Sequence, residues 1–253
     1  MRALRITAVV LVVLGVLAVA ADRIALRLAE SDAADRIEKE YGLSKRPEID
    51  IKGFPFLTQV MSREFEAVDV RIDGIDAVGS GGRKLRLDGV RGELAGVRIE
   101  GDDWDRATAD RADGTVTITY ADISAALPVV EVSYGGRDAA GDDKVRATVG
   151  ASFLGQRLEE SLFGEVSVVD GDTIRLRATD VDNLRGVPGL EDFVRDRMDY
   201  NWTVEDLPPG IRLTDVEVTK DGIVVTGGGE DVELGDERSA RNSAARPDPA
   251  SVG

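Results

Sequence analysis

From Glu64 onward, apolar residues recur at every second position. Val68, Val70 and Ile72 alternate with charged residues, the pattern of half-buried strands. The same period returns in Leu85–Leu87, Val116–Tyr120, Val130–Tyr134, Val145–Val149, Val166–Val168, Ile174–Ala178, Ile211–Leu213, Val216–Val218 and Ile223–Val225. Asp-Gly pairs, which suit the positive φ of tight hairpins, fall at 73–74, 88–89, 113–114, 170–171 and 221–222. The chain is therefore predicted to form an antiparallel meander rather than βαβ units.

The N-terminus is an uncharged apolar run with a positive flank. Arg2 and Arg5 precede Ile6–Ala21, and Asp22-Arg23 ends the run. This is the pattern of an export signal or a membrane anchor, with the bulk of the chain outside the cytoplasm. The run falls short of the roughly 20 residues that span a bilayer comfortably. Ala18–Ala20 fits a small-residue cleavage site, so cleavage and anchoring both stay open.

A helical pattern continues directly from the apolar run. Ile24, Leu28 and Ile37 recur at helical spacing up to Tyr41, and Gly42 is expected to end the helix. The continuity predicts one rod, which favours an uncleaved anchor. The alanine-rich side of the rod is suited to lie against a curved sheet; a juxtamembrane stalk is the alternative.

Two further segments are predicted to be helical, and both interrupt the strand pattern. The first is Asp122–Leu127, before Pro128, and the second is Leu190–Tyr200, opened by Pro188-Gly189. A bent sheet laid around such a helix leaves an apolar groove. An ordinary α+β core without a cavity is the alternative. Gly79–Gly82 and Gly227–Gly229 are predicted to be flexible turns.

Composition excludes several classes of function. The 253 residues contain no cysteine and no histidine, which removes thiol nucleophiles, disulfides, the Ser-His-Asp arrangement and the commonest zinc ligands. The net charge of −16 argues against nucleic-acid binding. Two acidic clusters lack the glycine and terminal glutamate of an EF-hand loop and are interpreted as solvated loop charges: Asp102, Asp103 and Asp105; Asp180 and Asp182 with Asn183. No catalytic residue, metal site or cofactor is predicted.

The segment Ile49–Val60, IDIKGFPFLTQV, concentrates aromatic residues in a chain that has few of them. It holds two of the six phenylalanines. Phe54, Phe56 and Leu57 surround Gly53 and Pro55, between the helical and the strand patterns. Clustered aromatics form either a plug at one end of a β-rich core or the mouth of an apolar cavity.

These features together resemble the LmeA-type phospholipid-binding proteins of the actinobacterial cell envelope. The resemblance lies in the membrane-spanning start, the helix ending near Gly42-Leu43-Ser44, the G-F-P-F-L-T-Q stretch, and Leu207–Gly210 before paired strands. It implies phospholipid binding on the outer side of the cytoplasmic membrane, with a role in envelope glycolipid maturation. It also implies a long curved antiparallel sheet wrapped around one or two amphipathic helices, with lipid contacted at Phe54, Pro55, Phe56 and Leu57.

The predicted fold class is α+β, in three parts: a signal anchor or signal peptide (1–21), one lipid-binding domain (22–234) and a disordered tail (235–253). The predicted function is non-enzymatic: the protein encloses the acyl chains of a phospholipid in an apolar cavity. It is attached through its N-terminal helix to the cytoplasmic membrane, or secreted if the apolar run is cleaved. The alternative is an extracytoplasmic β domain that binds another protein. An enzyme with two converging carboxylates comes third.

Overall fold

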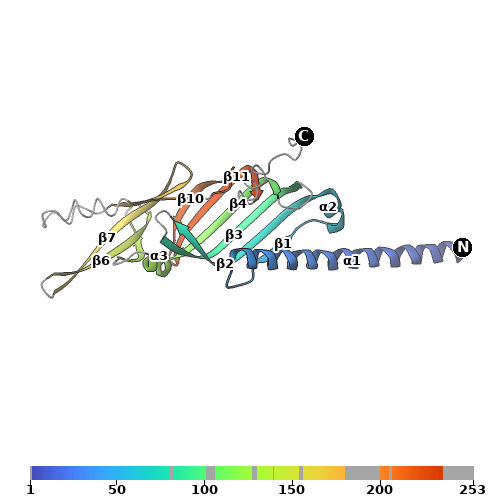
Figure 1. The fold of residues 1–253 in the computed structure, drawn as a ribbon, viewed down its shortest axis with the longest axis horizontal. Coiled ribbons are helices and arrows are strands. Elements are labelled where there is room, and N and C mark those ends of the chain that lie inside the picture. Colours follow the sequence, from blue (N-terminus) through green and yellow to red (C-terminus); the bar gives the residue numbers. More distant parts are fainter. Residues whose placement is uncertain are drawn as a thin grey trace, which may run out of the picture.

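The computed structural model describes residues 2–79, 83–100, 106–126, 130–138, 140–153, 156–179, 200–204 and 207–235. Within them the chain forms helices and two antiparallel sheets, which confirms the predicted α+β class (Figure 1). The helices are α1 (Arg2–Tyr41), α2 (Phe56–Ser62) and α3 (Tyr120–Ala126). The predicted single long sheet is divided in two, and neither described sheet closes on itself.

The six-stranded first sheet has the order β1-β2-β3-β4-β11-β10 and the five-stranded second sheet the order β5-β6-β7-β8-β9. The first contains β1 (Glu48–Ile51), β2 (Glu64–Gly79), β3 (Arg83–Glu100), β4 (Arg106–Thr119), β10 (Arg212–Val218) and β11 (Gly222–Gly235). The second contains β5 (Val130–Arg137), β6 (Asp143–Phe153), β7 (Gln156–Val169), β8 (Thr173–Ala178) and β9 (Tyr200–Thr203).

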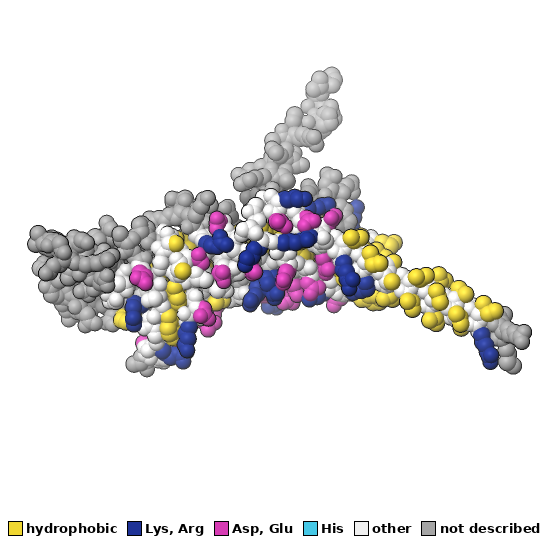
Figure 2. Space-filling view, turned by 90° about the horizontal axis from the view of Figure 1, so that it is seen from below, with side chains coloured by type: hydrophobic (Ala, Val, Ile, Leu, Met, Phe, Trp, Pro, Cys, Tyr) yellow, Lys and Arg dark blue, Asp and Glu magenta, His cyan; other side chains and the backbone are white. Residues whose placement is uncertain are grey.

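The helix α1 is one continuous rod of 40 residues, as predicted. It ends where Gly42 adopts a φ of +60°, the left-handed conformation that favours glycine after a helix. Its apolar half, Ile6–Ala21, is exposed and projects from the body (Figures 1 and 2). It is the one described helix long and apolar enough to cross a membrane. The following turns pack Ala25 and Ala29 against the core, which confirms the predicted role of the alanine-rich side.

The strands of the first sheet are longer than the alternating segments suggested, because the alternation changes phase within them. Gly74 and Gly96 have φ of +69° and +62°, and neither residue is paired with the neighbouring strand at that position. Ala112 is buried on one side of the Gly96 irregularity, whereas Val97 and Ala109 are buried on the other. Along the strands, the buried residues thus change from even-numbered to odd-numbered positions at this irregularity.

Three of the five predicted Asp-Gly turns are therefore wrong. The pairs at 73–74, 88–89 and 113–114 lie inside β2, β3 and β4. The other two are confirmed, since 170–171 joins β7 to β8 and 221–222 joins β10 to β11. The predicted turn at Gly227–Gly229 is also wrong, because β11 runs through it.

Among the described residues, two apolar clusters contribute to the core. The first contains Phe56, Phe65, Val97 and Ala109, packed against α1. The second contains Val132, Val145 and Val218, with Tyr120 and Ile123 of α3 packed on them. The helix α3 contacts both β3 and β5, so it lies where the two sheets meet. It confirms the helix predicted at Asp122–Leu127 as far as Ala126 and begins two residues earlier, at Tyr120; Leu127 lies outside the described residues.

Some predicted features lie outside the described residues. These are the glycines of the 80–82 connection, both acidic clusters, the helix at 190–199 and the tail beyond Gly235. Tyr200, predicted to end that helix, instead begins β9. Gly235, predicted to begin the tail, is the last residue of β11.

Candidate functional site

The aromatic segment of the sequence lies at the end of the body from which α1 projects (Figure 1). Its two phenylalanines face in opposite directions: Phe54 is 61% exposed, whereas Phe56 is 3% exposed. The Phe56 ring lies 6.3 Å from that of Phe65, centroid to centroid. Pro55 is the exposed residue before α2, and Leu57 is 43% exposed on α2. Three of the four predicted lipid contacts thus lie at the surface, and Phe56 lies in the core.

A buried carboxylate attaches α2 to α1. Asp22, 3% exposed, accepts a hydrogen bond from the backbone N–H of Leu57 at 2.9 Å. Arg23 Nη2 donates to the other carboxylate oxygen at 2.8 Å, and the Arg23 guanidinium lies 5.0 Å from the Phe54 ring centroid, within cation–π range. The sequence pattern marks Asp22-Arg23 only as the end of an apolar run. The two residues also position the aromatic segment.

The pKa of Asp22 reflects two opposing influences. Burial raises it, but hydrogen bonds from Leu57, Arg23 and Phe56 and the charge of Arg23 together hold it below the ordinary value of 3.8. A carboxyl with a depressed pKa stabilises the fold above its ordinary pKa, and this contribution is lost as the pH falls through the lowered value.

Asp22→Asn is therefore expected to destabilise the protein in a pH-dependent way. The difference in melting temperature from wild type should be largest near neutral pH and shrink as the pH falls below 3.8. At such pH the wild-type carboxyl becomes protonated and is then uncharged, like the asparagine side chain. Thermal unfolding of both proteins across this range measures it. A difference that stays constant with pH would contradict the assigned role of the charge.

A hollow of 370 Å³ opens beside Phe54. Phe54 and Phe65 line it together with mostly polar residues: Gln59, Glu64, Glu66, Gly96, Arg98 and Asp110. Arg98 and Asp110 form an ion pair at 2.6 Å within this lining. Because charged groups lose hydration when covered by hydrocarbon, this hollow is unsuited to hold acyl chains.

The apolar face of the first sheet carries a strip without side chains. Gly92, Gly114 and Gly227, which we call the glycine row, are directly paired across β3, β4 and β11. Val70 continues the row on β2. Apolar rows flank it: Val68, Leu94 and Ala112 on one side; Ile72, Val90, Val116 and Val225 on the other. The glycines are half-buried, and the row is a strip without side chains between the two flanking apolar rows. We call this strip the trough.

The space over the glycine row is open at Gly92. A Cβ atom placed there would meet only the backbone oxygen of Asp113, at 4.0 Å, which is ordinary contact. Gly92 does not have a positive φ, so its backbone conformation accepts other residues. The sheet geometry therefore does not require glycine at this position. A ligand that approaches the backbone closely is one reason for its presence.

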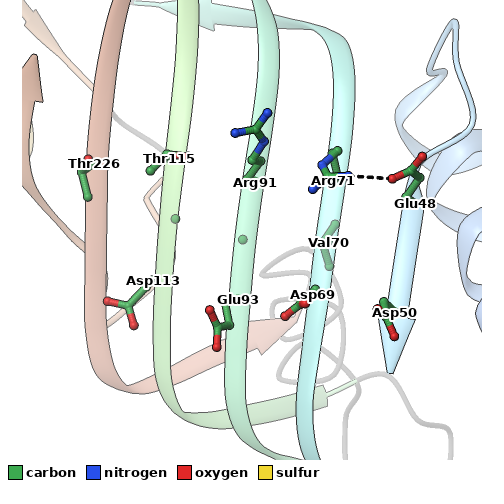
Figure 3. Close-up of a pocket in the computed structure, with 12 residues that line it drawn as sticks. Glu48, Asp50, Asp69, Val70, Arg71, Arg91, Glu93, Asp113, Thr115 and Thr226 are labelled. Carbon is green, nitrogen blue, oxygen red and sulfur yellow. Dashed lines mark hydrogen bonds and ion pairs between the residues drawn. The ribbon is translucent and has the colours of Figure 1, made fainter. Parts of the chain in front are cut away.

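The opposite face of the same sheet is charged. Asp50, Asp69, Glu93 and Asp113 form one row across four strands, and Glu48, Arg71, Arg91, Thr115 and Thr226 form the next (Figure 3). Together with Val70, Gly92 and Gly114 they line a hollow of 390 Å³. Cations pair with several of the acids: Arg71 with Glu48 at 2.9 Å and Lys52 with Asp69 at 3.1 Å. The hydrogen bond from Arg111 lowers the pKa of Asp113. The charged face is therefore suited to contact with water and not with lipid.

The chain matches a known protein family. A family model described as LmeA-like phospholipid-binding matches residues 20–228. The matched part begins near the end of the apolar run and includes α2, the whole glycine row and strands of both sheets. No curated protein and no solved structure matches the chain.

Proposed function

The chain belongs to the LmeA-like phospholipid-binding family, and on this premise we propose that it holds a phospholipid with its acyl chains against the apolar face of the first sheet. The resemblance inferred from the sequence is confirmed at the level of the family. The location of the lipid, the anchoring and the biological role are proposals.

The glycine row carries the proposal. It crosses four adjacent strands with Val70, which gives a length of about 14 Å at the usual strand spacing. An acyl chain in this trough is expected to contact backbone below and valine and leucine side chains on both sides. Each buried methylene contributes about 0.8 kcal/mol. Such binding needs no covalent step, catalytic residue or cofactor.

The proposed location is the outer side of the cytoplasmic membrane, with α1 as an uncleaved anchor. Arg2 and Arg5 before the apolar run support this orientation. The continuity of α1 into the body supports anchoring, because α1 itself supplies Ala25, Leu26 and Ala29 to the first apolar cluster. In this location we assign the protein to envelope glycolipid maturation in an actinobacterial envelope, the role that the family resemblance implies.

Gly92→Val tests the location of the lipid. Valine favours strands, and a Cβ atom fits at this position, so the fold is expected to persist while the side chain fills the trough. Displacement of two methylenes costs about 1.6 kcal/mol, roughly a 15-fold loss of affinity. The full-length protein is extracted from membranes in detergent, and co-purifying phospholipid is quantified by native mass spectrometry.

Gly89→Val is the matched control. Gly89 lies on the same strand, and a Cβ atom there meets nothing within 4 Å. Gly89 is odd-numbered like Arg91 and Glu93, which lie on the charged face (Figure 3). Because strand residues two apart point to the same side, Gly89 faces that side as well. The control should retain lipid at the wild-type level. Equal retention by both variants would refute the location at the glycine row. A wild-type protein that carries no lipid and takes up none from vesicles would overturn phospholipid binding and favour the protein-binding alternative.

A further inference from the structure

The exposed side of α2 is apolar. Met61 is 87% exposed, Phe54 just before the helix 61%, and Leu57 43%. Phe56 fixes the same short segment in the core, so these three side chains are presented by a firmly held element. We call Phe54, Leu57 and Met61 the apolar edge. Its side chains are of the types that enter membrane interfaces.

The position of the apolar edge relative to α1 identifies what covers it. Leu57 is hydrogen-bonded through its backbone to Asp22, the first residue after the apolar run Ile6–Ala21. If that run lies in the hydrocarbon core, Asp22 lies at its boundary, and the polar interfacial layer extends about 5–8 Å further. The helix α2 is held beside this turn of α1. Figure 2 shows hydrophobic side chains continuing from the projecting helix onto the adjoining end of the body.

We propose that the apolar edge inserts into the interfacial layer of the bilayer from which α1 emerges. The occupant is a phospholipid surface, and the inference rests on the anchoring described under the proposed function. Insertion places the end of the body in the membrane, so that a phospholipid leaving the outer leaflet reaches the protein without crossing water.

The charge of the protein supports an apolar mode of contact. With a net charge of −16, the body is repelled by anionic head groups, and attraction through a basic surface is not available to it as a whole. Arg23 lies over the Phe54 ring, where its charge remains near head-group phosphates while the ring faces the lipid. Apolar insertion thus provides contact with the membrane despite the repulsion between the net negative charge of the protein and anionic head groups.

A single-cysteine label tests the insertion. The chain has no cysteine, so Met61→Cys gives one attachment site for an environment-sensitive fluorophore in the full-length protein. The labelled protein is reconstituted in phosphatidylcholine vesicles containing phosphatidylcholine with a doxyl quencher near the head group. Lys220→Cys is the control, because Lys220 is exposed beside the turn between β10 and β11, at the other end of the sheet.

The label at position 61 is expected to be quenched several-fold more strongly than the label at position 220. The Gly92→Val background distinguishes the bilayer from lipid bound on the sheet: quenching at 61 should persist when the trough is filled. Quenching at 61 that equals the control, or that disappears in the Gly92→Val background, would overturn the insertion. Co-purification of lipid tests the proposed function independently, so each idea can fail without the other.

Discussion

Phe56→Ala is expected to lower the free energy of unfolding by about 3–5 kcal/mol, the usual cost of removing a buried phenylalanine side chain. The ring is 3% exposed and packs with Phe65, Val97 and Ala109. Residues of α1, β2, β3 and β4 meet in this cluster, so little of the resulting cavity can be closed by movement of a single element. Denaturant unfolding of the detergent-solubilised protein measures the effect.

Phe54→Ala is the matched control for this change. The same residue type two positions earlier is 61% exposed and has Arg23 over its ring, so its removal is expected to cost less than about 1 kcal/mol. The two variants separate the alternatives for the F-P-F segment: Phe56 serves the core and Phe54 the surface. Equal destabilisation by both changes would contradict this division. Replacing both phenylalanines at once would mix loss of fold with loss of lipid contact.

Gly229→Ala is expected to destabilise the protein by about 3 kcal/mol, the upper end of the usual cost of overpacking. A Cβ atom at this position would lie 1.9 Å from the carbonyl oxygen of Gly210. Gly210 is held by its surroundings, because Ile211 and Glu233 donate backbone hydrogen bonds to Pro208 and Pro209. The clash is therefore with fixed backbone, and the segment just before β10 must move away from β11.

Gly89→Ala controls for the general effect of replacing a strand glycine. Nothing lies within 4 Å of a Cβ atom there, so the change is expected to be neutral or slightly stabilising. Thermal unfolding of both variants gives the comparison. A Gly229→Ala protein as stable as wild type would show that Gly210 does not approach β11 as closely as described.

The helix α1 was the most predictable part of the fold, whereas α2 was not predicted. The apolar run, the helical spacing up to Tyr41 and the stop at Gly42 are local signals, and the helix begins and ends where they indicate. The strand segments were also found, but their lengths were not. At Gly74 and Gly96 the buried side changes parity, so a search for constant alternation ends a strand where the chain in fact continues it. Such irregularities depend on pairing with neighbouring strands.

The site was only partly predictable for a related reason. The composition of F-P-F-L marked an unusual segment, but which phenylalanine faces the core depends on Asp22 and Phe65, which lie 34 residues before and 9 residues after Phe56 in the sequence. The glycine row is even less visible, because Gly92, Gly114 and Gly227 become neighbours only through strand order and register. In the sequence, Gly114 resembled a turn residue after Asp113, and Gly227 belonged to an apparent flexible loop.

The continuity of α1 has a mechanical consequence. A domain on a flexible linker explores a hemisphere above the membrane, with a reach that grows with linker length. Under the proposed anchoring, the body here has no such linker, since the helix that enters the bilayer also packs Ala25 and Ala29 into the core. Its height and tilt follow those of the helix. Such a protein stays at one membrane and does not diffuse between membranes, so any acceptor of its lipid must bind it at the membrane surface.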